Sequence, residues 1–212
     1  MTLHDVRRDY SGEALPDDLT GFDPWAFLQG WVDDALASDE AEPTAMVLST
    51  VGLDGRPRAR VLLAKEVGPE GIVFFTHTDS PKGEELAATA SASAVFWWST
   101  LMRQVRAVGS VSELSREESE AYFASRPRAS QVGAWASHQS RPMASHSELK
   151  EAVDEAERRF DGVAEVPCPP QWGGYRMDVD ELEFWQGQPS RLNDRVLARR
   201  TDEGWTATYI QP

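Results

Sequence analysis

The chain has 212 residues, of which 26% are charged and 41% hydrophobic, a balance typical of one globular domain with a proper core. Its net charge of −14 argues against nucleic acid and anionic membranes as partners, and its single cysteine, Cys168, excludes an internal disulfide. No apolar run approaches the roughly 20 residues of a transmembrane helix, and the first residues lack a signal peptide's apolar stretch, so we expect a cytoplasmic protein.

Positive charge is unevenly distributed along this acidic chain. Among its 21 basic residues the lysines are Lys65, Lys82 and Lys150, and the other 18 are arginines. Many of the arginines bunch, as in Arg7-Arg8, Arg126/Arg128 and Arg191/Arg195. Local basic clusters in an acidic chain indicate a small anionic ligand rather than a polyanion.

The predicted elements begin with a polar segment. Residues 1–22 are expected to form a mobile arm, and residues 23–212 a single domain. Asp23 and Pro24 are typical of an N-cap and a first helical turn. The helix that they begin has an apolar face made of Trp25, Leu28, Trp31, Val32 and Ala35.

From residue 44 onward the pattern becomes that of β-strands with intervening helices. Strands are predicted at 44–51, 56–65, 71–76, 92–98, 104–114, 174–178, 181–185, 195–200 and 205–210. Short helices are predicted from Ser80-Pro81 to Ala88, after the Ser115/Glu118 capping box, around 132–135 and at 147–160. This order predicts an α+β fold, a closed antiparallel β-barrel with peripheral helices.

Several common kinds of site are excluded by their motifs. The four histidines have no metal-ligand spacing, and the sequence contains no Gly-x-Ser-x-Gly elbow, Gly-x-Gly-x-x-Gly loop or Walker loop. What remains is phosphate recognition by side chains. Lys82 is the first candidate, because it falls in a first helical turn, where backbone N–H groups and the helix dipole already favour an anion. The alternative is a solvated lysine.

Two further groups of residues are candidates for ligand binding. Tyr122 and Arg126 are spaced to share a helical face, and Ser130 follows just beyond, which suggests a second phosphate site or else a partly exposed helix edge. Near the C-terminus, Trp185 offers a flat face and Arg191 and Arg195 offer guanidinium forks. That combination suits a planar anionic ligand such as a flavin, the alternative being a surface hairpin with solvated arginines.

Together these segments resemble the pyridoxamine/pyridoxine 5′-phosphate oxidase family. The matching segments run in the same order over nearly the whole chain, and the most specific are 122–140 and 172–195. The resemblance implies an FMN-binding split barrel and a homodimer with two FMN sites formed between subunits. It also implies oxidation of pyridoxine 5′-phosphate and pyridoxamine 5′-phosphate to pyridoxal 5′-phosphate, with O2 reduced to H2O2.

The resemblance also implies roles for individual residues. FMN would be lined by Arg60, Val61, Leu62, Leu63, Lys65, Phe75, Thr76, Lys82, Gln104, Trp185 and Arg195, with Gln139 and Ser140 reaching it from the partner subunit. The substrate phosphate would be bound by Lys65, Tyr122, Arg126 and Ser130, while Arg191 and Asn193 would face the pyridine ring as the catalytic pair. Arg7, Arg8 and Tyr10 would form a flap over the substrate.

Two positions depart from the family's pattern. Pro81 stands where most relatives carry a basic residue, and Asn193 stands where the family has a histidine. Asparagine can hydrogen-bond but cannot become cationic, so we expect a slower enzyme that Asn193→His would improve. Two alternatives stay open, namely an FMN oxidase of another ring, as in the phenazine pathway, and a non-catalytic FMN or pyridoxal-phosphate binding protein.

Overall fold

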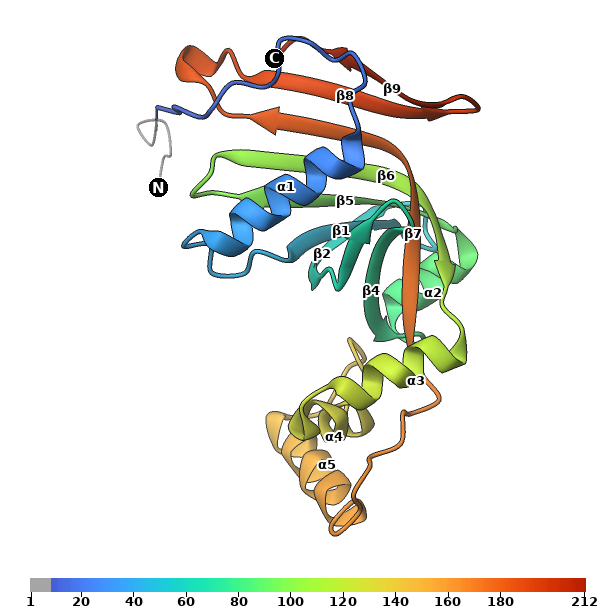
Figure 1. Ribbon diagram of the computed structural model, residues 1–212. Helices are drawn as coiled ribbons and strands as arrows, with labels where there is room; N and C mark the ends of the chain where they lie inside the picture. The colour runs from blue at the N-terminus through green and yellow to red at the C-terminus, as the bar shows by residue number, and fades with distance from the viewer. Residues whose placement is uncertain (1–8) are drawn as a thin grey trace.

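The computed structural model describes residues 9–212, so Arg7 and Arg8 of the predicted flap lie outside the described residues. The described chain forms a curled antiparallel sheet flanked by helices (Figure 1). The strands are β1 (Ala45–Val51), β2 (Pro57–Leu63), β3 (Glu66–Gly68), β4 (Gly71–His77), β5 (Ser91–Trp98), β6 (Arg103–Glu113), β7 (Trp172–Gln186), β8 (Asp194–Thr201) and β9 (Gly204–Tyr209). The helices are α1 (Pro24–Ala37), α2 (Pro81–Ala88), α3 (Arg116–Ser125), α4 (Arg128–Ala136), α5 (His146–Arg159) and a 3-10 turn at Pro189–Arg191.

The sheet is curled into a half-barrel and is not closed by hydrogen bonds as the sequence predicted, because β2 and β3, at the two ends of its order, do not pair with each other. Neighbours follow the order β2-β1-β5-β6-β7-β4-β3, and β8 and β9 extend the sheet from β7. Ala64 and Lys65 alone separate β2 from β3, so the chain itself joins the two ends of this order. β7 pairs with β4 through its first half and with β8 through its second half, which splits the barrel along this strand. The predicted antiparallel split barrel is therefore confirmed.

One prediction about the strands was wrong. The segments 174–178 and 181–185 are parts of a single strand, β7, rather than two strands joined by a turn. The polar run from Asp178 to Asp180 resembles a turn in sequence, but the pairing with β6 continues through it with one irregularity at Val108/Gly109. The carboxylates of Asp178 and Asp180 face outward, where both contact Arg200.

Helix starts follow the predicted capping residues. Asp23 accepts hydrogen bonds from the backbone N–H groups of Trp25 (2.9 Å) and Ala26 (3.2 Å) at the start of α1. Ser80 caps α2, and Ser115 and Glu118 form the predicted capping box of α3. Each cap satisfies N–H groups that have no partner inside the helix, which fixes where the helix begins.

Two apolar cores hold the elements in place. In the larger one, α1 lies across the sheet and packs Leu28 and Trp31 against Phe184 and other inward-facing strand residues (Figure 1). The smaller core joins α3, α4 and α5 around Phe123, with Trp172 contributed by the start of β7. β7 therefore links the barrel to the helical unit. No helix in residues 9–212 is long and apolar enough to cross a membrane.

Candidate active site

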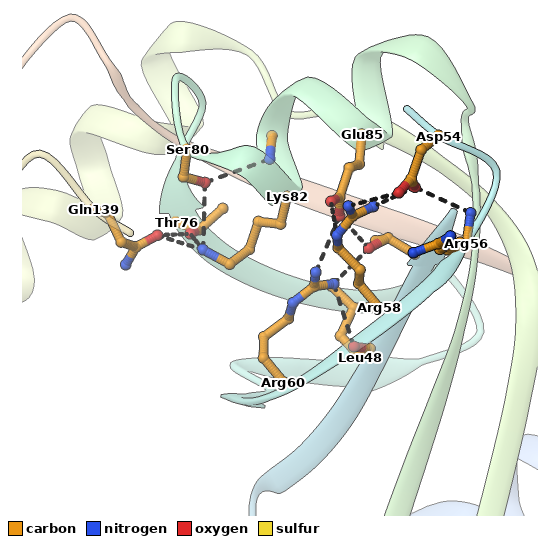
Figure 2. Close-up of polar contacts among 12 residues, drawn as sticks. Leu48, Asp54, Arg56, Arg58, Arg60, Thr76, Ser80, Lys82, Glu85 and Gln139 are labelled. Carbon is orange, nitrogen blue, oxygen red and sulfur yellow. Dashed lines mark hydrogen bonds and ion pairs between the residues drawn. The ribbon is translucent and has the colours of Figure 1, made fainter. Parts of the chain in front are cut away.

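The first part of the site is a cation at the start of α2. The Lys82 side chain is buried, with 6% of its surface exposed. Its ammonium donates to Oγ1 of Thr76 (3.1 Å), Oγ of Ser80 (3.3 Å) and Oε1 of Gln139 (Figure 2). These three partners are neutral oxygens, so they leave its charge uncompensated. Burial, followed by the charge of Arg60, lowers the pKa of Lys82 to about 8, although Glu85 opposes the shift.

Arg60 lies beside this cluster but has an acidic partner of its own. Its guanidinium donates to Oγ1 of Thr50 (2.6 Å) and to Oε2 of Glu85 (3.0 Å), a buried carboxylate on α2 (Figure 2). Arg58 approaches the other oxygen of Glu85 at 3.6 Å. Because Glu85 neutralises Arg60, Lys82 is the cation of this group that has the least compensation. Thr50 and Glu85 were not singled out by the sequence, where they look like ordinary strand and helix residues.

The second part of the site is a pocket of about 620 Å³ beneath α3 and α4. It contains all four residues predicted for the substrate phosphate, Lys65, Tyr122, Arg126 and Ser130. Phe75, Thr76 and Gln139 also line it, as does Leu63. The pocket therefore brings together residues from β2, β4, the helical unit and the start of β7 that are up to 109 positions apart along the chain, as Leu63 and Trp172 show.

Arg126 enters this pocket in a way that the sequence did not predict. It does not share the helical face of Tyr122, because α3 ends at Ser125 and Arg126 has extended backbone angles. Its guanidinium lies over the rings of Trp172 (4.9 Å) and Phe123 (5.5 Å). Its Nη1 atom is buried and has no hydrogen-bond partner within residues 9–212, and burial lowers its pKa. A guanidinium with one buried, unpartnered nitrogen carries a desolvation cost that a bound anion would offset.

A stack of aromatic rings forms one wall of the pocket. The rings of Phe75 and Tyr122 are stacked at 4.0 Å between centroids, and Trp172 is stacked on Phe75 at 5.2 Å. The stack joins β4, α3 and β7, so it fixes the floor on which Arg126 lies. Neither Trp172 nor Phe123 was predicted as a site residue individually, since their contacts depend on the packing of α3 against β7.

The third part of the site is a row of side chains at the far end of β7. Gln104, Trp185 and Arg195 are direct cross-strand neighbours on β6, β7 and β8, so they lie side by side on one face of the sheet. Trp97 and Tyr10 approach the Trp185 ring, each with 5.8 Å between centroids. Arg195 donates to Oε1 of the buried Glu183 at 2.6 Å, which orients its guanidinium beside Trp185.

Arg191 and Asn193 lie in the loop that follows this row. Ser190 and Arg191 have positive φ angles of 58° and 63°. Asn193 spans the loop, since its Oδ1 accepts from the N–H of Gln188 (3.0 Å) and its Nδ2 donates to the carbonyl of Arg191 (3.2 Å). In this chain the asparagine therefore shapes the backbone that carries Arg191, a use that the sequence did not reveal.

The described part of the predicted N-terminal arm packs against the same end of β7. The N–H of Gly12 donates to the carbonyl of Gly187 at 3.0 Å, and Leu15 approaches Asp194. Tyr10 is thus brought to Trp185, as a flap residue should be. The mobility of residues 1–22 stays a prediction.

Gln139 and Ser140 lie apart from that end. Gln139 contacts Thr76 and Lys82 of its own chain, and its predicted reach into the partner subunit stays a prediction. Ser140 is exposed, with a positive φ of 62°.

Of the predicted lining residues on β2, Leu62 packs against the core, whereas Val61 is 65% exposed. No group of three or more metal-ligating side chains occurs in the part of the chain that the structure describes.

Comparison with known proteins identifies the family. Residues 32–160 match the family model described as pyridoxamine 5′-phosphate oxidase, which covers more than half of the chain. The chain belongs to the pyridoxamine 5′-phosphate oxidase family. Residues 172–212, which carry Trp185 and Arg195, match the family's pyridoxine 5′-phosphate oxidase C-terminal dimerisation region. The predicted membership and the predicted homodimer are therefore confirmed.

Individual relatives agree over the full length. The chain is 47% identical over 210 residues to the pyridoxine/pyridoxamine 5′-phosphate oxidase of Thermosynechococcus vestitus, covering 99% of both chains. It is 45% identical to that of Rubrobacter xylanophilus, covering 99% of this chain and 96% of the relative. Among solved structures, PhzG from Burkholderia lata in complex with tetrahydrophenazine-1-carboxylic acid has a TM-score of 0.87 at 30% identity, over 95% of this chain and 100% of PhzG.

Proposed function

We propose that the protein is an FMN-dependent oxidase that converts pyridoxine 5′-phosphate and pyridoxamine 5′-phosphate to pyridoxal 5′-phosphate, with O2 as electron acceptor. Membership of the family and full-length identity to oxidases of these substrates support this function. The observation that carries it on the structure is a pair of cations, the buried Lys82 and the half-buried Arg126, whose contacts leave their charge free for an anion. One suits the phosphate of FMN and the other the phosphate of the substrate.

Lys82 and its neighbours fit an FMN phosphate. The ammonium already has oxygen partners at hydrogen-bond distance, and the capped start of α2 adds backbone N–H groups with the dipole's positive end. Gln104, Trp185 and Arg195 would hold the planar ring of the cofactor. Bound FMN would supply the two-electron acceptor for substrate oxidation.

The second phosphate site would fix the substrate. Lys65 and Arg126 would neutralise the substrate phosphate, with Tyr122 and Ser130 donating from the pocket wall. Holding the phosphate at one end limits the positions open to the pyridine ring, which lowers the entropic cost of reaching a reactive orientation. Arg191 would contact the ring, and Tyr10 would exclude water from it.

Distance along β7 supports a site shared between subunits. Trp172, beside the substrate-phosphate pocket, and Trp185, in the row with Gln104 and Arg195, lie near opposite ends of a 15-residue strand. An extended strand of this length spans up to about 45 Å. In Figure 1, β7 runs from the helical unit to β8 at the opposite end of the molecule. One flavin cannot contact both ends within one chain, so we infer that Trp185 approaches the pocket of the other subunit in the homodimer.

Arg126 also favours B6 phosphates over the ring substrate suggested by the likeness to PhzG. A ring without a phosphate would leave the buried Nη1 atom of Arg126 without a partner. The test is peroxide production by purified, FMN-loaded protein on addition of pyridoxine 5′-phosphate, pyridoxamine 5′-phosphate or unphosphorylated pyridoxine. We expect one FMN per subunit, and we expect peroxide with pyridoxine 5′-phosphate and pyridoxamine 5′-phosphate but not with unphosphorylated pyridoxine. Bound FMN without peroxide would instead favour the other-ring oxidase or the non-catalytic binding protein.

We also place the enzyme in the cytoplasm, which its lone cysteine supports.

A further inference from the structure

His77 is a titratable group in the substrate pocket to which no role has yet been given. It is the last residue of β4, it lines the pocket with Arg126 and Ser130, and it is 4% exposed. Its Nδ1 atom is sealed from solvent and has no hydrogen-bond partner within the described residues. The nearest acid is Asp79, whose Oδ1 lies 3.8 Å from Nδ1. Since Nδ1 is sealed and lies beside Asp79, Nε2 is the ring nitrogen available to a ligand in the pocket.

Titratable groups from His77's own segment and from three others act on this imidazole. They are Asp79 after β4, Lys82 on α2, Arg126 after α3 and His138 after α4. Burial lowers the pKa of His77, the two cations and His138 lower it further, and Asp79 opposes them. In the free pocket His77 is therefore neutral at pH 7.

We propose that His77 is a fifth ligand of the substrate's phosphate and that it becomes protonated when the phosphate binds. The inference rests on the proposed function and deepens it, since it assigns a pH-dependent contact to the same pocket. A phosphate monoester carries a charge of about −1.5 to −2 at pH 7. Its arrival offsets the positive field of Lys82 and Arg126, and solvent supplies the proton. Asp79 is placed to accept the resulting Nδ1–H after a small movement.

This linkage predicts the direction of the pH effect. The bound phosphate raises the pKa of His77 above its free value, so between these two values binding takes up a proton and phosphate affinity rises as pH falls. Below the free pKa the ring is protonated in both states, and the effect levels off. Phosphate itself titrates near pH 6, but this contribution is common to all variants.

The test uses FMN-saturated holoenzyme with inorganic phosphate as a competitive inhibitor of pyridoxine 5′-phosphate oxidation. At pH 6.5 we expect the inhibition constant of His77→Asn to be about tenfold above wild type, the scale of a hydrogen bond to a charged group. The difference should shrink to about twofold at pH 8.5, where the imidazole no longer contributes charge. His146→Asn makes the same exchange at an exposed position on α5 and should match wild type.

Calorimetry gives a second readout that does not depend on turnover. Phosphate binding measured in two buffers of different ionisation enthalpy should show proton uptake by wild type and less by Asp79→Asn, an exposed change that keeps the imidazole. Parallel pH profiles for wild type and His77→Asn would overturn the proposal. If His77→Asn does not fold, equal proton uptake by wild type and Asp79→Asn would overturn it. A wild type that oxidises neither B6 phosphate would instead refute the proposed function.

Discussion

At the scale of single residues, the neighbours of Arg126 leave its positive charge available to a ligand. The guanidinium lies over two aromatic rings, and its Nη1 atom has no partner in residues 9–212. Arg60, by contrast, is neutralised by Glu85. Arg126 can therefore compensate the charge of a bound anion more fully than Arg60 can, because the carboxylate of Glu85 already pairs with Arg60.

The first prediction concerns this arginine. Arg126→Ala should weaken the binding free energy of pyridoxine 5′-phosphate by about 2–5 kcal/mol, the range for removing one partner of a buried charge pair. The effect should appear in KM, while FMN affinity stays near wild type. Arg158→Ala, on the exposed face of α5, is the control. If the affinities for FMN and for substrate fell equally, Arg126 would not be specific to the substrate phosphate, and the assignment would be wrong.

The second prediction concerns Asn193. Asn193→Ala removes both hydrogen bonds that span the 188–193 loop, where Ser190 and Arg191 have positive φ angles. We expect kcat/KM for pyridoxine 5′-phosphate to fall by about 1–2 kcal/mol as Arg191 loses its position. Asn193→His adds a donor able to carry charge but disturbs these bonds, so its gain should be smaller than the charge alone would give. Unchanged kinetics in Asn193→Ala would contradict a bracing role.

At the scale of elements, the start of α2 is the site's main source of positive potential. Ser80 both caps the helix and contacts the Lys82 ammonium, so helix start and cation are placed by the same residue. Pro81 at the first position of α2 carries no charge, so Lys82 is the cation at this helix start. This is why its protonation should control cofactor binding.

The third prediction follows from the lowered pKa of Lys82. With a pKa of about 8, the free lysine is protonated at pH 7 and largely neutral at pH 9, so FMN affinity should fall by about tenfold over that interval. Flavin fluorescence titration of apoprotein measures it. Lys82→Met should bind FMN weakly with a flat profile across pH 8, and Lys150→Met should behave like wild type. The same pH slope in Lys82→Met would assign it to another group.

The fourth prediction concerns the irregular pairing of β6 and β7. A Cβ atom at Gly109 would lie 2.0 Å from the carbonyl oxygen of Asp178 and 2.8 Å from Cα of Val179, both backbone atoms. Gly109→Ala should therefore lower the free energy of unfolding by about 2 kcal/mol or more. Gly30→Ala, which meets nothing within 4 Å on α1, should raise it by about 0.5–1 kcal/mol. Urea denaturation compares the two, and similar values would contradict the clash.

Local signals predicted local structure well, and they failed where packing decides. Asp23, Ser80 and Ser115 each indicated a helix start that the structure has. The continuity of β7 could not be predicted, because a polar run can be a turn or an outward-facing bulge, and pairing with β6 makes the choice. The pocket's aromatic stack likewise depends on how α3 lies against β7. The side on which Gln139 acts depends on the fold of the 137–141 turn.

At the scale of the whole molecule, β7 gives the protein two functional ends. One end carries Trp172 beside the substrate-phosphate pocket and the other carries Trp185, and both lie in residues 172–212, which match the dimerisation region. In the arrangement that we propose, a monomer would hold half of each site. Dimerisation would then be a requirement of catalysis and not an addition to stability, because each active site would take one end of β7 from each subunit.

The last prediction tests this arrangement by mixing two impaired chains. Arg126→Ala impairs the pocket end and Arg191→Ala the other end. In a mixed dimer, one site carries both changes, while the second takes Arg126 and Arg191 from the unaltered ends of the two chains. Random pairing makes half of the dimers mixed, so co-expression should restore about a quarter of wild-type activity at low substrate. Each variant alone should stay nearly inactive. If both residues acted within one chain, every site would carry a change and mixing would restore nothing.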